Sequence, residues 1–412
     1  MALRDNQSYN LVMDAIYSSF MRQKARVEGM HDEDIRDPHI IISIAKKLNL
    51  LPNPNNCIRI SGSKGKGTCA RMAAKLLEKT THKKIALFIS PEELDHNDRM
   101  SINGTHPNKQ EFINLYNDIK PDLLAAENTL KDGQYLSPFG IFLLLSLKYF
   151  KNNQADYWVI ECGRGAKYDE AGNIPSKISV ITSILFEHAA SLGPQLVDIA
   201  ENKLSIALHS QQLVCTPEVA NWNKRLNMVA NHKIIEIEPL PTNQILPNWV
   251  MQDAALARAA VKNLLESEIS SEINLLNCSA AFGVLKFQQY SIYFDASIHQ
   301  KSMDEGFFKH ITSQQKSIVL ASLPDDKDSQ AMRQFFKTQL NLPFYQLALS
   351  GTRGYLHYNN AKQNGDIYTE INYEDTQSFK QILSELMTDN KADCVFLIGT
   401  QTYIRLVKQA LA

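Results

Sequence analysis

The hydrophobic pattern of the chain alternates between two kinds of segment. Short runs rich in β-branched and aromatic residues are typical of buried strands, and longer stretches with apolar residues at helical spacing lie between them. In the first part of the chain the predicted strands are Cys57–Ser61, Ile85–Ser90, Tyr157–Glu161 and Ser179–Leu185. The predicted helices are Tyr9–Arg26, Thr68–Lys79, Lys109–Ile119, Phe139–Lys151 and Pro194–Leu208. Strands that alternate with helices predict an α/β fold with a mainly parallel sheet.

The same alternation returns in the last part of the chain after an interruption. A Pro-bearing stretch is followed by an Ala-rich predicted helix (Gln252–Leu265) and by a polar segment (Glu266–Glu272) that is typical of a linker. The later predicted elements are the strands Gln289–Asp295, Ser317–Ser322, Phe344–Leu349 and Asp393–Gly399 and the helix Gln401–Ala412. We therefore expect two domains, a larger parallel-sheet domain over residues 1–267 and a smaller, Rossmann-like α/β domain over residues 268–412.

The composition excludes several classes of protein. The 412 residues include 43 Lys and Arg against 44 Asp and Glu, so the formal net charge of −1 leaves no basic surplus for nucleic acid or anionic lipid. The six cysteines are scattered without a Cys-x-x-Cys pair, which predicts reduced thiols rather than a zinc site or disulfides. The longest apolar run, Phe139–Leu147, is too short to span a membrane, and Met1–Asn10 contains no apolar signal segment. We expect a cytoplasmic protein without nucleic-acid or membrane partners.

A glycine-rich segment between a predicted strand and a predicted helix is the clearest chemical motif. It reads Gly62-Ser63-Lys64-Gly65-Lys66-Gly67-Thr68. Its glycines let backbone N–H groups approach an anion closely, the start of the helix adds partial positive charge, and Lys66 can reach terminal phosphates. The spacing is shorter than that of the commonest P-loop, which has a glycine where Ile60 stands. A surface turn is the alternative, but the flanking strand and helix favour a phosphate-binding P-loop.

Polar residues at the ends of three other predicted strands extend this site. Glu161 ends one strand, Ser90 ends a second, and His188 follows a third. In an open parallel sheet the carboxyl ends of the strands form one edge, where ligands bind. A carboxylate there suits Mg²⁺ bound to nucleotide phosphates. Taken alone, an exposed glutamate at a strand end is common, and a lone serine or histidine there is usually a cap or a satisfied surface group.

Lys203 interrupts an apolar stripe. On its predicted helix the stripe runs through Leu196, Ile199 and Ile206, so Lys203 stands where the helical period requires an apolar residue. One interpretation is a lysine whose stem is buried and whose ammonium reaches water. The other is a desolvated amine near the phosphate site, able to stay neutral or to be carbamylated into a metal ligand.

Together these segments resemble the Mur ligase superfamily, and most closely the folylpolyglutamate and dihydrofolate synthases. Gly62–Thr68 stands where that family has Gly-Thr-Asn-Gly-Lys-Gly-Ser, and Ile89-Ser90-Pro91 stands where it has Thr-Ser-Pro. Asn97–Met100 is similar to its Asn-Glu-Arg-Ile run, and Glu161–Asp169 to its Glu-x-Gly-x-Gly-Gly-x-x-Asp segment. The resemblance is good over roughly residues 8–265 and weak afterwards.

The resemblance implies an ATP-dependent ligase that joins an amino acid, glutamate or another, to a small carboxylate acceptor through an acyl phosphate. It implies that the loop from Gly62 to Thr68 binds the phosphates of ATP and that Lys66, Lys203 and His188 are catalytic. By the same resemblance the Mg²⁺ ligands would be Ser90, Glu161, His188 and a carbamylated Lys203.

Two further nucleotide-binding residues are implied by the resemblance. Gln252-Asp253 stands where the family has a Gln…Asn pair, with Asp in place of Asn, and Asp295 survives from the Asp-Gly-Ala-His-Asn motif of the C-terminal domain. Asp326-Lys327-Asp328 is similar to a short charged motif of that domain.

Several positions depart from the family pattern and keep a second hypothesis open. Ala166 replaces the third glycine of the Glu-x-Gly segment, Val284 stands where the family has an arginine, and Ile298 stands where it has a histidine. These departures motivate a nucleotide-binding homologue without full ligase turnover. Within the ligase class, a poly-γ-glutamate-type ligase is the alternative for substrate.

Overall fold

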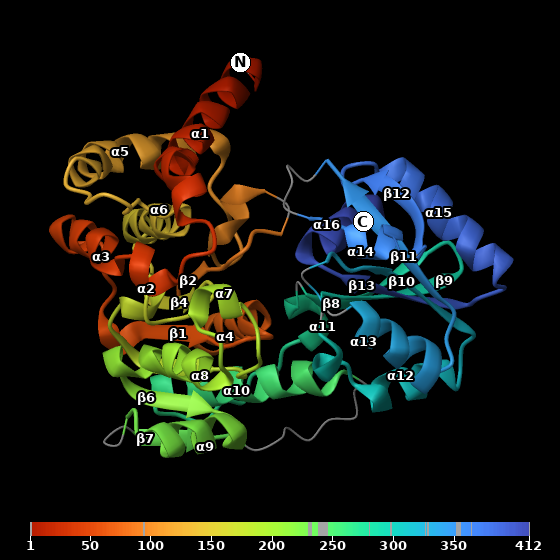
Figure 1. The fold of residues 1–412 in the computed structure, drawn as a ribbon. Helices are drawn as coiled ribbons and strands as arrows, with labels where there is room; N and C mark the ends of the chain where they lie inside the picture. The colour runs from red at the N-terminus through yellow and green to blue at the C-terminus, as the bar shows by residue number, and fades with distance from the viewer. Residues whose placement is uncertain are drawn as a thin grey trace. The chain divides into compact units, whose positions relative to one another are not determined.

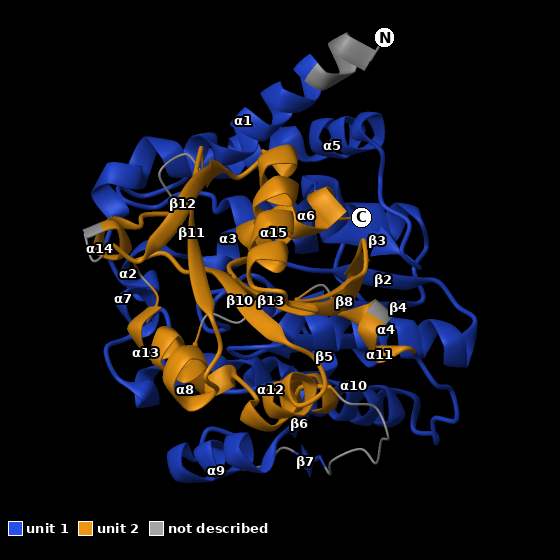
Figure 2. Cartoon of the chain, turned by 90° about the vertical axis from the view of Figure 1, so that its right-hand side faces the viewer, with its two compact units in different colours: residues 1–240, 252–273 blue, residues 241–251, 274–412 orange. Residues whose placement is uncertain are grey.

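The computed structural model describes residues 2–93, 95–229, 233–237, 246–279, 281–296, 299–325, 327, 329–351, 356–363 and 365–411. The chain forms two compact units (Figure 2). Residues 1–240 and 252–273 make up unit 1, and residues 241–251 and 274–412 make up unit 2. The predicted boundary after residue 267 falls within the second segment of unit 1.

Unit 1 is built on a mainly parallel sheet. Its seven described strands have the order β3-β2-β4-β1-β5-β6-β7. β3 runs antiparallel to β2, and the other neighbouring strands are parallel. The strands are β1 (Cys57–Ser61), β2 (Ile85–Phe88), β3 (Met100–Ile102), β4 (Tyr157–Glu161), β5 (Ser176–Ile181), β6 (Ser210–Cys215) and β7 (Lys233–Glu236).

Helices cover this sheet and cap its edges (Figure 1). They are α1 (Ala2–Val27), α2 (Asp32–Ile35), α3 (Pro38–Lys47), α4 (Lys66–Thr81), α5 (Lys109–Glu127), α6 (Pro138–Asn152), α7 (Ala189–Leu192), α8 (Leu196–Leu204), α9 (Pro217–Leu226) and α10 (Asn248–Leu265), of which residues 252–265 belong to this unit. Short helical turns are η1 (Pro54–Asn56), η2 (His96–Arg99), η3 (Ala171–Asn173) and η4 (Ser205–His209).

The core of unit 1 follows from the two-residue period of its strands. Cys57 of β1 joins a buried cluster with residues of α1, α3, α5 and α6, and Phe88 of β2 belongs to the same cluster. Ile58 and Ile60, which alternate with Cys57, are fully buried outside that cluster. They face the other side of the sheet, and α4 packs against β1, β2 and β4. Burial on both faces explains why these strands read as continuous apolar runs.

Unit 2 contains a second, mainly parallel sheet of order β12-β11-β10-β13-β9-β8, in which only the pair β8–β9 is antiparallel among the described strands. The strands are β8 (Phe282–Phe287), β9 (Tyr290–Asp295), β10 (Ser317–Ser322), β11 (Phe344–Ser350), β12 (Ile367–Asn372) and β13 (Cys394–Gly399). The helices are α11 (Leu275–Cys278), α12 (Glu305–Thr312), α13 (Ser329–Gln334), α14 (Asn359–Gln363), α15 (Thr376–Asp389) and α16 (Gln401–Leu411), with the turns η5 (Gln300–Ser302) and η6 (Phe335–Gln339).

The predicted α/β class, a parallel sheet followed by a smaller α/β set, is confirmed. Two elements have ends that differ from the predicted ones. The predicted strand Ser179–Leu185 is wrong at both ends, because β5 ends at Ile181 and the following residues leave the sheet to contact the glycine-rich loop. The predicted helix Pro194–Leu208 is shorter, because α8 ends at Leu204 and gives way to the turn η4. No helix among the described segments combines the length and apolarity needed to cross a membrane.

Candidate functional site

The site lies at the carboxyl edge of the unit 1 sheet, beside strand β1. The chain passes through β2, β3 and β4 on one side of β1 and then crosses to β5, β6 and β7 on the other. Such a reversal of strand order separates the loops that leave neighbouring strands and opens a crevice for a ligand. The glycine-rich loop leaves β1 at this point, between the ends of β4 and β5.

The glycine-rich loop has a backbone that only glycine adopts without strain. Gly62 and Gly65 have φ values of 139° and 87°, and Gly65 is the residue that precedes α4. A side chain at Gly67 would place its Cβ 3.2 Å from Glu161 Oε2. The start of α4, a 16-residue helix, lies directly after the loop, so the N–H groups of its first turn and the positive end of its dipole are placed as phosphate binding requires.

Two residues after β5 hold this loop in place. The backbone N–H of Ser63 donates to the Ser183 carbonyl oxygen (2.9 Å), and that of Lys64 donates to Ser183 Oγ (3.1 Å). Thr182 Oγ1 donates to the Lys64 carbonyl oxygen at 2.6 Å. Thr182 and Ser183 were not assigned from the sequence, although two hydroxyl residues inside a run otherwise rich in apolar residues are a signal that could have found them.

Lys66 and Glu161 come from neighbouring strand ends. Lys66 is the first residue of α4, and its Nζ donates to the Gly62 carbonyl oxygen at 3.0 Å. Glu161 at the end of β4 is only 3% exposed, and its Oε2 accepts the backbone N–H of Ser90 at 2.9 Å. Burial raises the pKa of Glu161 to about 7, against the lowering effect of the Lys66 charge. The structure thus brings Lys66, Ser90 and Glu161 to the loop as their strand-end positions predicted.

Lys203 is completely buried, which contradicts the interpretation of an ammonium that reaches water. Its Nζ donates to the carbonyl oxygens of Gly62 (2.9 Å) and Arg164 (3.0 Å), and it lies 3.0 Å from Glu187 Oε1. Burial lowers the pKa of Lys203 to about 8, while Glu187 opposes that shift. Glu187 was not assigned from the sequence, because a lone acid after a strand is too common to single out.

His188 follows Glu187 and adopts a left-handed backbone conformation with φ of 51° at the start of α7. Its Nε2 lies 3.8 Å from Glu187 Oε2. Burial lowers the pKa of His188, and the charges of Lys66 and Lys203 lower it further. The imidazole is therefore neutral near pH 7, the form in which it can act as a ligand.

The start of α10 brings a further pair of predicted residues to the loop. Gln252 Nε2 donates to the carbonyl oxygen of Thr182 at 2.9 Å. Asp253 is 2% exposed and lies against Gly65, where a Cβ would collide with its carboxylate. Its Oδ2 has no hydrogen-bond partner among the described residues. Burial raises the pKa of Asp253 well above its usual range, despite the nearby Lys64 and Lys66 charges.

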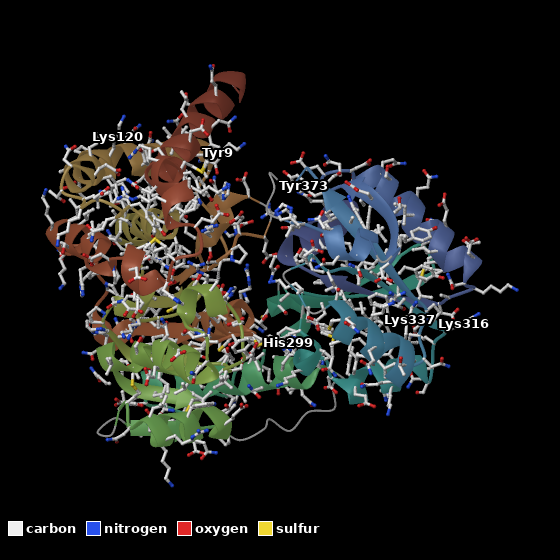
Figure 3. The ribbon with its side chains drawn as sticks, viewed as in Figure 1. Tyr9, Lys120, His299, Lys316, Lys337 and Tyr373 are labelled. Carbon is white, nitrogen blue, oxygen red and sulfur yellow. The ribbon has the colours of Figure 1, made fainter. Side chains whose placement is uncertain are left out.

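The predicted residues of the last part of the chain belong to unit 2 and are described there alone. Asp295 is the last residue of β9 and is buried. His299, labelled in Figure 3, directly precedes η5, and its ring accepts the backbone N–H of Lys301. Val284 lies on β8 and is 38% exposed. Ile298, and Asp326 and Asp328 of the charged motif, lie outside the described residues.

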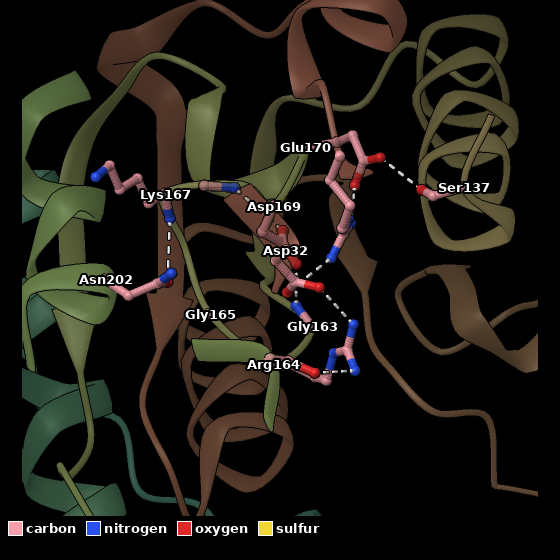
Figure 4. A network of polar contacts seen from close by, with 12 residues as sticks. Asp32, Ser137, Gly163, Arg164, Gly165, Lys167, Asp169, Glu170 and Asn202 are labelled. Carbon is pink, nitrogen blue, oxygen red and sulfur yellow. Dashed lines mark hydrogen bonds and ion pairs between the residues drawn. The ribbon is translucent and has the colours of Figure 1, made fainter. Parts of the chain in front are cut away.

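An ionic network, buried except for Arg164, supports the loop that follows β4 (Figure 4). Arg164 Nη2 donates to Asp32 Oδ1 at 2.8 Å, and Arg36 Nη2 donates to Glu170 Oε2 at 2.6 Å. Asp169 Oδ2 accepts the backbone N–H of Gly163 at 2.9 Å. Because the Arg164 carbonyl binds Lys203, the network ties α2 to the buried amine. No sequence signal marked Asp32 or Arg36, since charged residues in a polar segment are normally solvated.

Several curated proteins are similar in sequence. A dihydrofolate synthase/folylpolyglutamate synthase of Buchnera aphidicola (Schizaphis graminum) is 23% identical over 390 residues, covering 87% of this chain and 88% of that protein. The corresponding Buchnera aphidicola (Acyrthosiphon pisum) protein is 28% identical over 163 residues, only 38% of its length. The folylpolyglutamate synthase of Candida albicans is 27% identical over 256 residues, 50% of its length. Two of these three matches thus span half or less of the relative. No family model matches the chain.

Solved structures extend the likeness to the whole fold. A Mycobacterium tuberculosis folylpolyglutamate synthase complexed with ADP and AMPPCP has a TM-score of 0.73 at 15% identity, covering 96% of this chain and 99% of that one. Escherichia coli FolC in complex with DHPP and ADP has a TM-score of 0.69 at 19% identity, covering 90% and 92%. The chain is thus a relative of the dihydrofolate and folylpolyglutamate synthases and has their fold, as its motifs predicted.

Proposed function

We propose that the protein is an ATP-dependent ligase that joins the amine of an amino acid to a carboxylate acceptor through an acyl phosphate. Glutamate and a folate-like carboxylate are the expected substrates, because the relatives are named folylpolyglutamate synthases. The observation that supports the proposal most is the meeting of the Gly62–Thr68 loop, Glu161 and the buried Lys203 at one sheet edge.

The loop and the start of α4 would bind the phosphates of ATP. Backbone N–H groups there can donate to phosphate oxygens, and the helix dipole favours their negative charge. Lys66, the first residue of α4, would shift its ammonium from the Gly62 carbonyl to the terminal phosphate. ADP and AMPPCP in a structural neighbour support a nucleotide as the ligand.

The residues at this edge also suit Mg²⁺ in part. Mg²⁺ prefers oxygen ligands, takes one or two carboxylates and keeps several waters. Glu161 is a buried carboxylate that accepts a backbone N–H from Ser90 and has lone pairs left for a cation. Among the described residues no three His, Cys, Asp or Glu side chains gather closely enough to hold a metal by themselves. A magnesium bound through Glu161, Ser90 and His188 would supply charge neutralisation at the phosphates.

The carbamylated form of Lys203 stays a prediction. The amine donates to two carbonyl oxygens and pairs with Glu187. A carbamate would present oxygens that accept hydrogen bonds, so it could not keep these three contacts. Carbamylation would therefore require Glu187 and the two carbonyl groups to find other partners.

The proposed reaction has two displacements. An oxygen of the acceptor carboxylate bonds to the γ-phosphorus while the bond from that phosphorus to the leaving ADP oxygen breaks. The neutral amine then bonds to the acyl carbon, phosphate leaves, and the nitrogen gives up a proton to solvent. The protein's share is positioning and charge stabilisation, which Lys66 and the helix start supply at the transferred phosphoryl group.

The proposal is tested by product formation. Purified protein with ATP, Mg²⁺, glutamate and a folate-like carboxylate is expected to yield the amide, ADP and phosphate, followed by mass spectrometry. Omitting the acceptor or the amino acid should stop ADP release. Nucleotide binding without any amide product across a panel of carboxylates and amino acids would favour the second candidate, a nucleotide-binding homologue without turnover, which Val284 in place of the family's arginine motivates.

A further inference from the structure

Asp253 is a buried acid whose carboxyl group is incompletely hydrogen-bonded among the described residues. It lies on α10 with 2% of its surface exposed, and within the described part of the chain its Oδ2 has no hydrogen-bond partner. Its carboxyl group packs against Gly65, the residue that precedes α4. A buried polar atom without a partner is costly, so such an atom beside a binding loop points to a group that a ligand supplies.

The charged groups that face Asp253 do not stabilise its ionised form sufficiently. Lys64 and Lys66 of the loop favour the carboxylate, but burial outweighs them and raises the pKa of Asp253 well above its usual range. The Cys69 thiol behind the loop has its own pKa raised by burial and by Asp253 and Glu161. The acid is therefore mainly protonated under conditions in which exposed aspartates are ionised.

The protonation state of Asp253 matters because its carboxyl group lies beside the proposed phosphate-binding loop. A nucleoside triphosphate brings several negative charges to Gly62–Thr68, and an ionised carboxylate in contact with Gly65 would repel them. A neutral carboxyl group instead carries an O–H that can donate a hydrogen bond. The amide of asparagine has a similar shape and also donates, but it does not titrate.

We propose that Asp253 contacts the bound nucleotide as a neutral carboxylic acid that donates a hydrogen bond to it, so that nucleotide binding weakens when this proton is lost as pH rises. The inference rests on the proposed nucleotide site and adds to it the form in which this acid acts. It predicts that Asp253→Asn preserves nucleotide binding and removes one source of its pH dependence.

The test measures the Kd of AMPPCP with Mg²⁺ by calorimetry from pH 6 to pH 9, in the wild type, Asp253→Asn and Asp14→Asn. Asp14 is exposed on α1 and serves as the matched control. Since the nucleotide itself titrates, the quantity of interest is the difference between proteins at each pH. We expect wild type and Asp14→Asn to lose affinity together toward pH 9, by up to about tenfold per pH unit relative to Asp253→Asn.

The outcomes separate this inference from the proposed function. If the wild type binds nucleotide but Asp253→Asn follows the same pH profile, or if it loses affinity equally at every pH, the inference is wrong and the nucleotide site stands. If the wild type binds no nucleotide at any pH, the proposed function itself fails. Should Asp253→Asn not fold, Asp253→Ser keeps a hydroxyl donor and carries the same expectation of a flatter profile.

A second readout needs no nucleotide. A carboxyl group with a raised pKa in the folded state costs stability as pH rises from its unfolded value toward its folded value. Asp253→Asn should therefore have a higher Tm than the wild type at pH 8, with the difference shrinking toward pH 4. An equal Tm difference at both pH values would contradict a buried, titrating acid at this position.

Discussion

The ammonium of Lys203 lies 3.0 Å from Glu187 Oε1 in a position with no solvent access for the lysine. Burial alone would raise the pKa of Glu187, but the Lys203 and Lys66 charges lower it below its usual range. Each group therefore holds the other in its charged form. The pair fixes the amine at the Gly62 carbonyl, next to the proposed phosphate site.

Replacement of Glu187 by glutamine should destabilise the protein. The change leaves a fully buried amine without its carboxylate, and breaking a buried ion pair costs about 3–5 kcal/mol. Because the Glu187 side chain is 27% exposed, we expect a smaller loss, on the order of 2 kcal/mol. Urea unfolding at pH 7 followed by circular dichroism measures it.

The control for this prediction is the double variant. Lys203→Met replaces the amine by an apolar side chain of similar length, so Glu187→Gln should cost little in its presence. Equal losses for Glu187→Gln in both backgrounds would mean that the pair contributes nothing to stability.

Lys66→Ala should weaken nucleotide binding. Charge-assisted hydrogen bonds contribute roughly 1.5–3 kcal/mol, which corresponds to an increase of about 10- to 100-fold in the Kd for AMPPCP. Lys75→Ala is the matched control, since Lys75 lies on the exposed face of the same helix. Calorimetry at pH 7.5 distinguishes them, and equal affinities of the two variants would remove Lys66 from the phosphate site.

Glu161 should make the stability of the metal-free protein fall between pH 4.5 and pH 7. Its folded-state pKa of about 7 lies above the unfolded value, so the folded state binds more protons in this window. The free energy of unfolding then decreases as pH rises, by on the order of 3 kcal/mol across the window. In chelator-containing buffer, the free energy of unfolding of Glu161→Gln should therefore rise relative to that of the wild type over the same pH range. Parallel pH profiles of the two proteins would show that the pKa of Glu161 does not differ between the folded and unfolded states.

Asp32→Asn should be strongly destabilising, although α2 is a helix of only four residues. The Asp32 side chain is 3% exposed and faces both Arg36 and Arg164. Removal of the Asp32 charge leaves the guanidinium of Arg36, which is nearly buried, with less negative charge to stabilise it. We expect the free energy of unfolding, measured in urea, to fall by about 3 kcal/mol. Asp34→Asn, on the exposed side of α2, should change stability by less than about 0.5 kcal/mol. Similar losses in both variants would indicate an effect of helix charge instead.

The sequence predicted the helices and strands whose apolar residues follow a clear pattern. It also predicted several polar residues at the carboxyl ends of strands. Ile58 and Ile60 lie in a continuous apolar run, and such a run is readable because β1 is buried on both faces. Lys66, Ser90 and Glu161 could be placed together because parallel strands share one carboxyl edge. Lys203 was visible as a break in a stripe, although its periodicity alone favoured an ammonium that reaches water, which its complete burial contradicts.

Other contacts could not be predicted because they join distant segments. Glu187 pairs with Lys203, and Asp32 with Arg164, through side chains that the local pattern treats as ordinary surface residues. The buried Arg59 lies within an apolar strand, and its guanidinium donates to Ser176 Oγ and to the Ile206 carbonyl oxygen. Such pairs form where loops from distant parts of the chain meet at the edge of the sheet. The hydrophobic pattern within one segment carries no information about these meetings.

The position of α2 has a practical consequence for shortened versions of the chain. A version that starts at Pro38 would remove Asp32 and Arg36 together, and with them the partners of Arg164 and Glu170. The sheet and the glycine-rich loop would remain encoded, yet the carbonyl that holds Lys203 would lose its anchor. Anyone trimming the protein for expression should therefore retain this early helix, even though it contributes no strand and no ligand of its own.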